Sequence, residues 1–382
     1  MYFKKIYRAY INKITNWLFG FVYMPAETKK KGFVLISYIT EPFTLAPWEA
    51  FSNFHTMYWE CYEIARLFSQ RGYASYIVDA KKQKYIPKKK YIVCLDVENN
   101  FETYASFLPK NCKKVFHILI PYWRAYNEAE ENRLNQLEKR RGMRLMPRRT
   151  VSASRDAELA DFLEGFGNKT VFNTFSQYKK TPFFIPISAV IKYDFPENKN
   201  WEEARKNFLW VGGGGMVLKG LDMTLEAFST QPDLHLHICG PIYGESDFTE
   251  AYKKELTEMP NIHTYGRIDV TDREFREIIK KCGAVVYPSA GEGTSGAIVQ
   301  AMHAGLIPII TNETGIQEDS GYIPLIDPTP ESVSKAIRDF STMTEVEMRS
   351  FSKKIWTYAR THYTREEFSK AYARFVDDVL HL

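Results

Sequence analysis

The fold is decided by the stretch Asn207-Phe-Leu-Trp-Val-Gly-Gly-Gly-Gly-Met-Val-Leu-Lys219-Gly220, followed about seventy residues later by Val286-Tyr-Pro-Ser-Ala-Gly-Glu292-Gly-Thr-Ser-Gly-Ala-Ile-Val-Gln300. In the first stretch, an apolar run at 208–211 predicts a buried strand, and a helix is expected to begin near Lys219 after the four glycines. In the second, residues 284–287 predict another strand and residues 295–304 another helix. Two such strand–turn–helix units predict a parallel sheet covered by helices.

The glycine turn indicates a close approach of a ligand to the backbone, because four consecutive glycines cost chain entropy and contribute no packing. Backbone N–H groups at Gly213, Gly214 and Gly215, with Lys219 beside a helix start, form an anion site. The alternative is a flexible loop without a ligand. Lys219 is not followed by Ser or Thr, and no acidic residue ends a strand about twenty positions on, so neither a Walker A loop nor a dinucleotide fingerprint is present.

The second turn offers a carboxylate and further N–H groups. Ser295 and Gly296 are expected to present free amides at a helix N-terminus, with Glu292 just before them and Gln300 one to two turns in. Glu292 could instead be a carboxylate that complements the helix dipole. One turn with an ammonium group and one with a carboxylate suit a ligand that carries a diphosphate and hydroxyls. The two turns therefore predict a nucleotide sugar at the carboxyl edge of the sheet.

Residues 207–341 resemble the retaining glycosyltransferases of the GT-B fold, in the large family 4 group. The resemblance rests on Lys219-Gly220, on the Glu292-x7-Gln300 spacing and on Ala301-Met-His-Ala-Gly305. It implies an α/β fold of two Rossmann-like domains whose parallel sheets face a central cleft. Two departures from the family pattern are visible. The arginine usual in the first turn is replaced by glycine (213 or 214), and the second glutamate of the motif is Gln300.

The resemblance also implies roles for these residues. Lys219 would bind the donor phosphates and Glu292 the donor sugar, and these two are the predicted catalytic residues. Gln300 would bind the ribose diol, since an amide both donates and accepts. The predicted nucleotide-sugar ligands are Gly213, Gly214, Gly215, Lys219, Ser295, Gly296 and Gln300.

Composition sets broader limits. A length of 382 residues predicts two domains, and 45% hydrophobic residues allow two full cores. The net charge of +5 does not indicate a nucleic-acid partner. Five scattered cysteines, none in a CxxC pair, are typical of free thiols in a reducing cytosol. The chain has neither zinc-spaced ligands nor an Asp-x-Asp, so we expect no cofactor and no metal.

Residues 1–24 predict a basic amphipathic helix, because aromatic and aliphatic residues recur at helical spacing opposite a group of lysines and arginines. The longest apolar run, 17–24, is shorter than the ~20 residues that span a bilayer, and no signal-peptide cleavage site follows. We expect segment 1–31, with its lysines at 29–31, to anchor a cytoplasmic protein peripherally on the inner face of the membrane. The alternative is a helix packed through its apolar stripe on the protein itself.

Residues 32–193 are expected to form the acceptor domain. A strand, a helix, a glycine and a second strand at 33–79 resemble the first unit of GT-B N-terminal domains. His55 begins the helix of this unit, where it would either contact substrate or cap the helix. His117 lies within a predicted strand and is interpreted as a buried histidine, in preference to a catalytic one.

Asn127, Glu130 and Arg133 lie on one stripe of a charged helix at 127–141. They are similar to an Asn-x-Ala-Glu-x-x-Arg run of some bacterial family-4-like transferases, which implies an acceptor or cleft element.

The remaining domain boundaries follow from breaker residues and periodicity. Residues 194–205 are polar and rich in Pro and Asn, which predicts the linker. Residues 206–361 alternate strand and helix and form the donor domain. The last helix, within 362–382, crosses back to the first domain in GT-B folds.

Together these features predict a metal-independent hexosyltransferase that moves a sugar, with retention, from a UDP- or GDP-linked donor to a hydroxyl acceptor. The acceptor expected from the amphipathic N-terminus is a glycan, lipid-linked, in surface polysaccharide synthesis. Two alternatives stay open. One is a GT-B-type nucleotide-sugar epimerase, which would consume donor without acceptor. The other is a non-catalytic nucleotide-sugar-binding or scaffold protein, which the glycine at the arginine position and Gln300 would suit.

Overall fold

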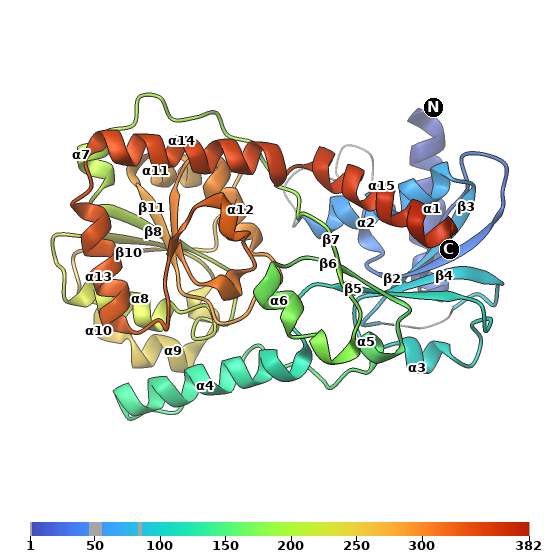
Figure 1. The fold of residues 1–382 in the computed structure, drawn as a ribbon, viewed down its shortest axis with the longest axis horizontal. Helices are drawn as coiled ribbons and strands as arrows, with labels where there is room; N and C mark the ends of the chain where they lie inside the picture. Colours follow the sequence, from blue (N-terminus) through green and yellow to red (C-terminus); the bar gives the residue numbers. More distant parts are fainter. Residues whose placement is uncertain (1, 46–55, 83–85, 382) are drawn as a thin grey trace.

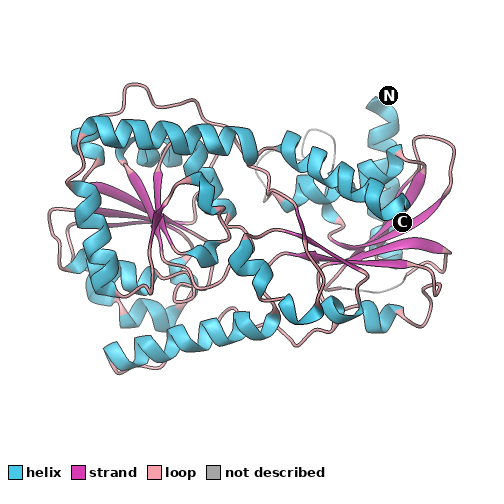
Figure 2. Cartoon of the chain, in the orientation of Figure 1, coloured by secondary structure: helices cyan, strands magenta, loops and turns pink. Residues whose placement is uncertain are grey.

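The computed structural model describes residues 2–45, 56–82 and 86–381. The chain forms two α/β domains side by side, each a sheet covered by helices (Figures 1 and 2). The two turns that decide the fold both lie in the C-terminal domain.

The N-terminal sheet has seven strands in the order β1-β3-β2-β4-β5-β6-β7, and all neighbours pair in parallel except β1, which is antiparallel to β3. Apolar residues such as Val34, Ile36 and Val93 are fully buried in it, as parallel strands covered on both faces require. The strands are β1 (Phe21–Met24), β2 (Gly32–Tyr38), β3 (Tyr73–Asp79), β4 (Tyr91–Asp96), β5 (Lys113–Ile118), β6 (Phe162–Gly165) and β7 (Phe183–Phe184).

The C-terminal sheet has six parallel strands in the order β10-β9-β8-β11-β12-β13. β8 and β11 are neighbours, so the glycine turn after β8 and the Glu292 turn after β11 leave the same edge side by side. The strands are β8 (Asn207–Val211), β9 (His235–Cys239), β10 (Ile262–Gly266), β11 (Ala284–Tyr287), β12 (Ile307–Ile310) and β13 (Ile323–Pro324).

Helices cover both sheets. The longer ones are α1 (Tyr2–Phe19), α2 (Met57–Gln70), α4 (Trp123–Arg141), α8 (Leu221–Ser229), α11 (Arg273–Lys281), α12 (Gly296–His303), α13 (Pro330–Ser341), α14 (Glu345–His362) and α15 (Arg365–His381). The shorter ones are α3 (Phe101–Tyr104), α5 (Asp156–Leu159), α6 (Lys169–Asn173), α7 (Trp201–Ala204), α9 (Ser246–Ala251) and α10 (Lys253–Thr257). None of the helices in the described ranges is both long and apolar enough to cross a membrane.

The N-terminal segment differs from the helix predicted for residues 1–24. Helix α1 ends at Phe19, Gly20 follows with a φ of 79°, and residues 21–24 form strand β1. The alternation of buried and half-buried residues in β1 is that of an edge strand. Because β1 pairs with β3, segment 1–31 is not a separate element but contributes to the N-terminal sheet.

The chain crosses between the domains earlier than the predicted linker 194–205. Ser188 is held in the N-terminal domain, where its N–H and hydroxyl both bond Glu60 at 2.9 Å. Ile191 is already held by the C-terminal domain through Gln300. The crossing therefore lies at 189–190, and the Pro/Asn-rich segment after it packs on the C-terminal domain, with Trp201 buried there.

Two sets of helices bridge the domains on opposite sides of the molecule. At one side α14 leads into α15, which lies on the N-terminal domain and bonds it through Arg71–Asp377 and Tyr372–Glu164 (Figure 1). At the other side α4 leaves the N-terminal domain and runs along the C-terminal domain beside α8 and α9 (Figure 1).

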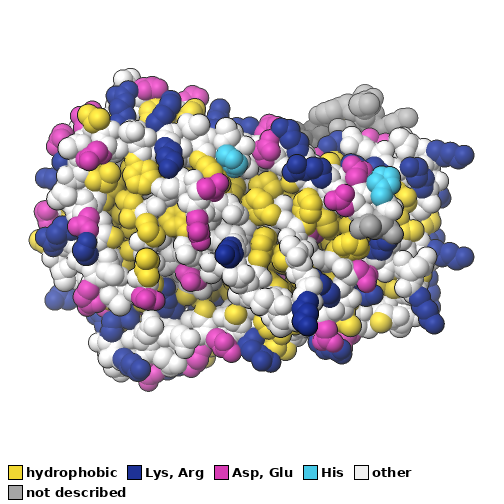
Figure 3. Space-filling view, viewed as in Figure 1, with side chains coloured by type: hydrophobic (Ala, Val, Ile, Leu, Met, Phe, Trp, Pro, Cys, Tyr) yellow, Lys and Arg dark blue, Asp and Glu magenta, His cyan; other side chains and the backbone are white. Residues whose placement is uncertain are grey.

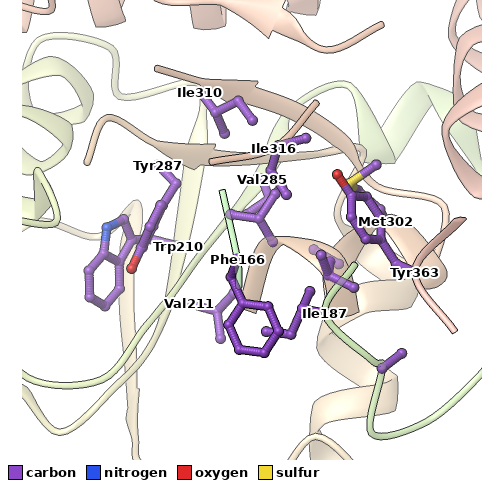
Figure 4. Packing of buried hydrophobic residues seen from close by; sticks show 14 of the residues in the cluster. Phe166, Ile187, Trp210, Val211, Val285, Tyr287, Met302, Ile310, Ile316 and Tyr363 are labelled. Carbon is purple, nitrogen blue, oxygen red and sulfur yellow. The ribbon is translucent and has the colours of Figure 1, made fainter. Parts of the chain in front are cut away.

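Apolar packing is continuous between the domains. Phe166, which follows β6, and Ile187 lie among C-terminal-domain residues such as Val211 and Met302 (Figure 4). On the face drawn in Figure 3, hydrophobic side chains gather across the middle, and Lys and Arg side chains are spread over the margins. The domains are thus in contact over the edge where both turns lie.

Candidate functional site

The two turns bring Lys219 and Glu292 together, as the neighbouring positions of β8 and β11 require. The Lys219 Nζ bonds Glu292 Oε1, and the Tyr287 hydroxyl donates to the same oxygen over 2.9 Å. The Lys219 side chain is 8% exposed and that of Glu292 15% exposed. A lysine and a carboxylate from two separate turns therefore form one nearly buried ion pair.

Tyr287 contacts both members of this pair. Its ring lies beside Trp210 (Figure 4), and the Lys219 Nζ lies 5.7 Å from the centre of the ring. Burial and the facing Glu292 carboxylate raise the pKa of the Tyr287 hydroxyl well above its ordinary value, so it remains a hydrogen-bond donor. Glu292 is thus held by two donors through its Oε1, which fixes the carboxylate at the turn, where it could accept bonds from sugar hydroxyls.

The glycine turn is only partly open. The N–H groups of Gly215 and Met216 donate to the Glu245 carboxylate, at 2.5 and 3.2 Å. The expectation that all three glycines offer free amides is therefore wrong for Gly215 in this structure. Among the described residues, Gly213 and Gly214 have no acceptor for their N–H groups.

Close contacts explain why the turn is built of glycine. A Cβ at Gly212 would lie 3.0 Å from the Trp210 ring, and Gly215 has a φ of 91°, which side chains rarely adopt. A Cβ at Gly215 would also meet the stem of Arg149 from the other domain. Of the four glycines of the turn, Gly213 alone would have no atom of the described residues within 4 Å of an added Cβ.

The start of α12 also differs from expectation at Ser295. Its N–H donates to the Thr314 carbonyl over 2.9 Å and is not free for a ligand. Gly296, the first residue of α12, remains half-buried at the helix N-terminus, where the dipole favours an anion.

Gln300 does not face the turns. It is 3% exposed, its Oε1 accepts from the Ile191 N–H at 3.1 Å, and its Nε2 donates to the Ile191 carbonyl at 2.7 Å. A carboxylate could not make the second bond, which gives a physical reason for glutamine here. The predicted role of Gln300 in binding a ribose diol does not fit this geometry, because the amide already holds the interdomain crossing.

The N-terminal domain closes over the second turn. A Cβ at Gly291 would lie 2.9 Å from the Tyr126 ring, and one at Gly293 would lie 2.8 Å from the Leu119 carbonyl carbon. The turn between β5 and α4 thus touches the Glu292 turn with only glycine-sized room between them. The structure is a closed arrangement of the two domains.

The predicted acceptor residues of α4 instead position neighbouring segments. Asn127 bonds both backbone groups of Val151, at 2.8 and 2.9 Å. Glu130 accepts from the N–H groups of Arg148 and Arg149, each at 2.7 Å. Arg133 is buried and donates across the domain boundary to the Pro288 carbonyl and to Met223 Sδ.

The two predicted histidines lie elsewhere. His55 is outside the described residues. His117 is fully buried and bonds Glu164 at 2.8 Å, as expected of a buried strand histidine.

Three residues of the site were missed from the sequence. Tyr287 ends β11 five positions before Glu292, a spacing that could have indicated it. Glu245 and Arg149 come from loops after β9 and α4, and no local pattern marks either as a neighbour of the glycine turn.

Comparison with known proteins agrees with this geometry. Residues 205–342 match the family model described as "Glycosyl transferases group 1". Residues 205–342 are thus similar to a glycosyl transferase group 1 domain. The domain contains both turns, so the resemblance seen in Lys219-Gly220 and the Glu292 motif is confirmed.

Curated relatives match a part of the chain. Proteins named 3-methyl-2-oxobutanoate hydroxymethyltransferase from Listeria monocytogenes and Listeria innocua are each 31% identical, over 140 and 146 residues. The match covers 34% of this chain, and the chain spans about half the length (48%) of these relatives. Their name describes a hydroxymethyl transfer, and a match of this extent carries no activity over to this chain.

Solved structures establish the fold around the glycosyl transferase group 1 domain. A sucrose-phosphate synthase from Thermosynechococcus elongatus matches with a TM-score of 0.64 and 11% identity, over 92% of this chain and 100% of that one. HepE of Anabaena, solved with UDP-glucose, matches with a TM-score of 0.56 and 9% identity, over 91% and 99% of the chains. The chain has the predicted GT-B fold, with two mainly parallel sheets.

Proposed function

We propose that the protein is a retaining glycosyltransferase that moves a hexose from a nucleotide-sugar donor to a hydroxyl of a glycan acceptor. The observation that carries the proposal is the Lys219–Glu292 pair at the adjoining carboxyl ends of β8 and β11. A cation suited to a diphosphate and a carboxylate suited to sugar hydroxyls stand side by side, in a glycosyl transferase group 1 domain. The family match and the UDP-glucose bound to the structurally similar HepE support a nucleotide-sugar ligand.

In this reaction the bond between the anomeric carbon and the diphosphate breaks, and a bond to the acceptor oxygen forms on the same face. The acceptor proton leaves with the nucleoside diphosphate. Negative charge grows on the diphosphate as it departs, and Lys219, the free N–H groups of Gly213 and Gly214 and the N-terminus of α12 would stabilise it. Glu292, held in place by Tyr287, would fix the sugar hydroxyls.

The ligand must compete with contacts inside the protein. Donor phosphates would draw the Lys219 ammonium group away from Glu292. Phosphate binding would thereby free the Glu292 carboxylate to bond the sugar hydroxyls. Because the β5–α4 turn touches the Glu292 turn, the domains must also separate for the donor to enter.

The test is a transfer assay with UDP- and GDP-linked hexoses and a panel of glycan acceptors. Glu292→Gln should lower turnover by roughly 10²–10³-fold, the loss typical for one preorganised group, while nucleotide binding persists. Donor consumption without acceptor would identify an epimerase instead. Nucleotide-sugar binding with no turnover in the unaltered protein would identify the non-catalytic alternative.

We also propose that the acceptor is lipid-linked and is met at an anionic membrane surface. Helix α1 faces its own domain with polar residues. Asn12 is 3% exposed and bonds the Phe43 carbonyl and the Tyr23 N–H, and Asn16 bonds Thr40. The apolar side points outward, so the alternative of an apolar stripe packed on the protein is wrong.

The outward face is large and aromatic, and basic residues flank it. Trp17 is 76% exposed and Tyr7 69% exposed. The exposed apolar residues of α1 are Tyr7, Tyr10, Ile11, Ile14, Trp17, Leu18 and Phe19. Arg8 and Lys13 of the same helix are exposed, and so are the lysines at 29–31. Aromatic residues beside basic ones are typical of helices that lie in a membrane interface.

Co-sedimentation with vesicles tests this. Tyr7→Ser/Tyr10→Ser/Trp17→Ser should reduce binding to vesicles containing phosphatidylglycerol by at least tenfold, since each aromatic side chain loses on the order of 1.5–3 kcal/mol of apolar burial. The matched control is Tyr243→Ser/Ile326→Ser, two exposed apolar residues on the other domain, 65% and 78% exposed. Equal binding by both variants would contradict the proposal.

A further inference from the structure

The charges at the glycine turn do not balance within the C-terminal domain. Two carboxylates, Glu245 and Glu292, lie at the turns, and Lys219 is already paired with Glu292. A donor diphosphate would add about two negative charges, as phosphate groups carry at neutral pH. If Lys219 turned to the diphosphate, Glu292 would lose its cation, so the two turns lack a second cation for the ligand that they would hold.

Arg149 of the N-terminal domain lies at this place. Its aliphatic stem packs on Gly215, where a Cβ would lie within 2.8 Å of the Arg149 Cδ. Its Nε donates to the Tyr126 hydroxyl over 3.1 Å. Within residues 2–45, 56–82 and 86–381, no carboxylate lies within ion-pair distance of its guanidinium, although the field of Glu292 reaches it. The contacts with Gly215 and Tyr126 thus hold the Arg149 side chain in place, and its two terminal nitrogens make no salt bridge within the described residues.

The segment that carries Arg149 is rigidly held. Glu130 accepts from the N–H groups of Arg148 and Arg149 and from the Thr150 hydroxyl, and Asn127 holds Val151 through both backbone groups. Both holding residues lie on α4, which is itself fixed on the C-terminal domain. A guanidinium kept in one place without a carboxylate partner among the described residues is a preorganised anion ligand, and its planar fork suits two phosphate oxygens at once.

We infer that Arg149 binds the diphosphate of the donor from across the domain boundary, above Gly213 and Gly214, and supplies the cation that the glycine turn lacks. The inference rests on the proposed function. It gives Asn127 and Glu130 a role as positioning residues for Arg149. It also makes the phosphate site complete only when α4 lies against the C-terminal domain.

The test compares binding of UDP, GDP and the matching nucleosides, uridine and guanosine, by calorimetry. Arg149→Gln should weaken binding of the preferred nucleoside diphosphate roughly 10- to 100-fold, as expected for a charge-assisted contact, and leave nucleoside binding within about twofold. The matched control, Arg148→Gln, removes an arginine that pairs with Asp247 on the surface and should change neither.

A rescue variant separates phosphate binding from a structural effect. Because a Cβ at Gly213 meets nothing within 4 Å, Arg149→Gln/Gly213→Arg restores a cation beside the turn and should regain part of the lost diphosphate affinity. Equal losses for diphosphate and nucleoside, or no recovery in the double variant, would overturn the inference. If the unaltered protein binds neither UDP nor GDP, the proposed function itself fails, which is a distinguishable result.

Discussion

The contact between the two domains at the Glu292 turn yields a graded test. Gly291 faces the Tyr126 ring and Gly293 faces the backbone of Leu119, both in the N-terminal domain, whereas Gly213 faces open space. None of the three has a positive φ, so alanine is compatible with the local backbone at each. The three alanine variants therefore differ mainly in how far they oppose closure of the domains.

The magnitudes follow from the distances. Gly291→Ala places a methyl group 2.9–3.1 Å from the Tyr126 ring, which can shift slightly. Overpacking by one such group costs about 1–3 kcal/mol, which lowers the closed-to-open ratio roughly 5- to 150-fold. At Gly293 the obstacle is the main chain, which cannot rotate away, so the effect should lie at or above about 3 kcal/mol. Gly213→Ala should have almost no effect on closure, because its Cβ would meet no described atom within 4 Å.

Two assays report the result. Energy transfer between dyes on Lys110→Cys and Val346→Cys, one exposed site on each domain, measures closure, because all five native cysteines are buried. Sugar transfer measures its consequence, and kcat/KM should fall further for Gly293→Ala than for Gly291→Ala. If Gly293→Ala closes to the same extent as Gly213→Ala in the dye assay, the β5–α4 turn and the Glu292 turn do not meet in solution. The closed arrangement would then be wrong.

Other predictions concern a buried acid, the α4 contact and metal ions. Burial raises the pKa of Glu60 to about 7, so its stabilising protonation is present below pH 4.5 and is lost as the pH rises through 7. Glu60→Gln should therefore flatten the fall in urea-measured stability between pH 5 and 8.5, by up to about 3 kcal/mol; an unchanged pH profile would refute this. Arg140→Ala leaves the fully buried Asp222 without its 2.6 Å partner and should cost about 2–4 kcal/mol, whereas Arg144→Ala, which removes only exposed pairs, should leave the stability nearly unchanged in the same unfolding assay. Since the chain has no Asp-x-Asp, transfer should persist in EDTA, and full loss restored by Mg²⁺ would contradict that expectation.

The sequence was sufficient for the features that depend on local pattern. Strand and helix periodicity placed β8, β11 and α12 within a residue or two, and the adjoining strand ends explain why Lys219 and Glu292 meet. Both groups lie in turns whose geometry is set by neighbouring residues.

Features set by distant segments could not be predicted in this way. Glu245 lies 30 positions from Gly215, and Arg149 approaches the same glycine from the other domain. A free amide and an occupied one look identical in a sequence, which is why Ser295 and Gly215 were misjudged. The pattern of α1 defined an apolar face but not its direction, because only the bonds of Asn12 decide which side faces the protein.

Helix α12 has a mechanical consequence. Gln300 makes two hydrogen bonds to Ile191, beside the first crossing of the chain between the domains. One turn later, His303 Nε2 bonds the Tyr363 carbonyl over 2.9 Å, at the junction of α14 and α15. Both crossings of the chain between the domains are thus hydrogen-bonded to one helix, α12, which follows the Glu292 turn. A translation of one domain past the other would break the hydrogen bonds of Gln300 and His303. A rotation between the domains needs only a few dihedral angles to change, at 189–190 and near Tyr363. A hinge at these two crossings would therefore lie beside α12, next to the candidate ligand site.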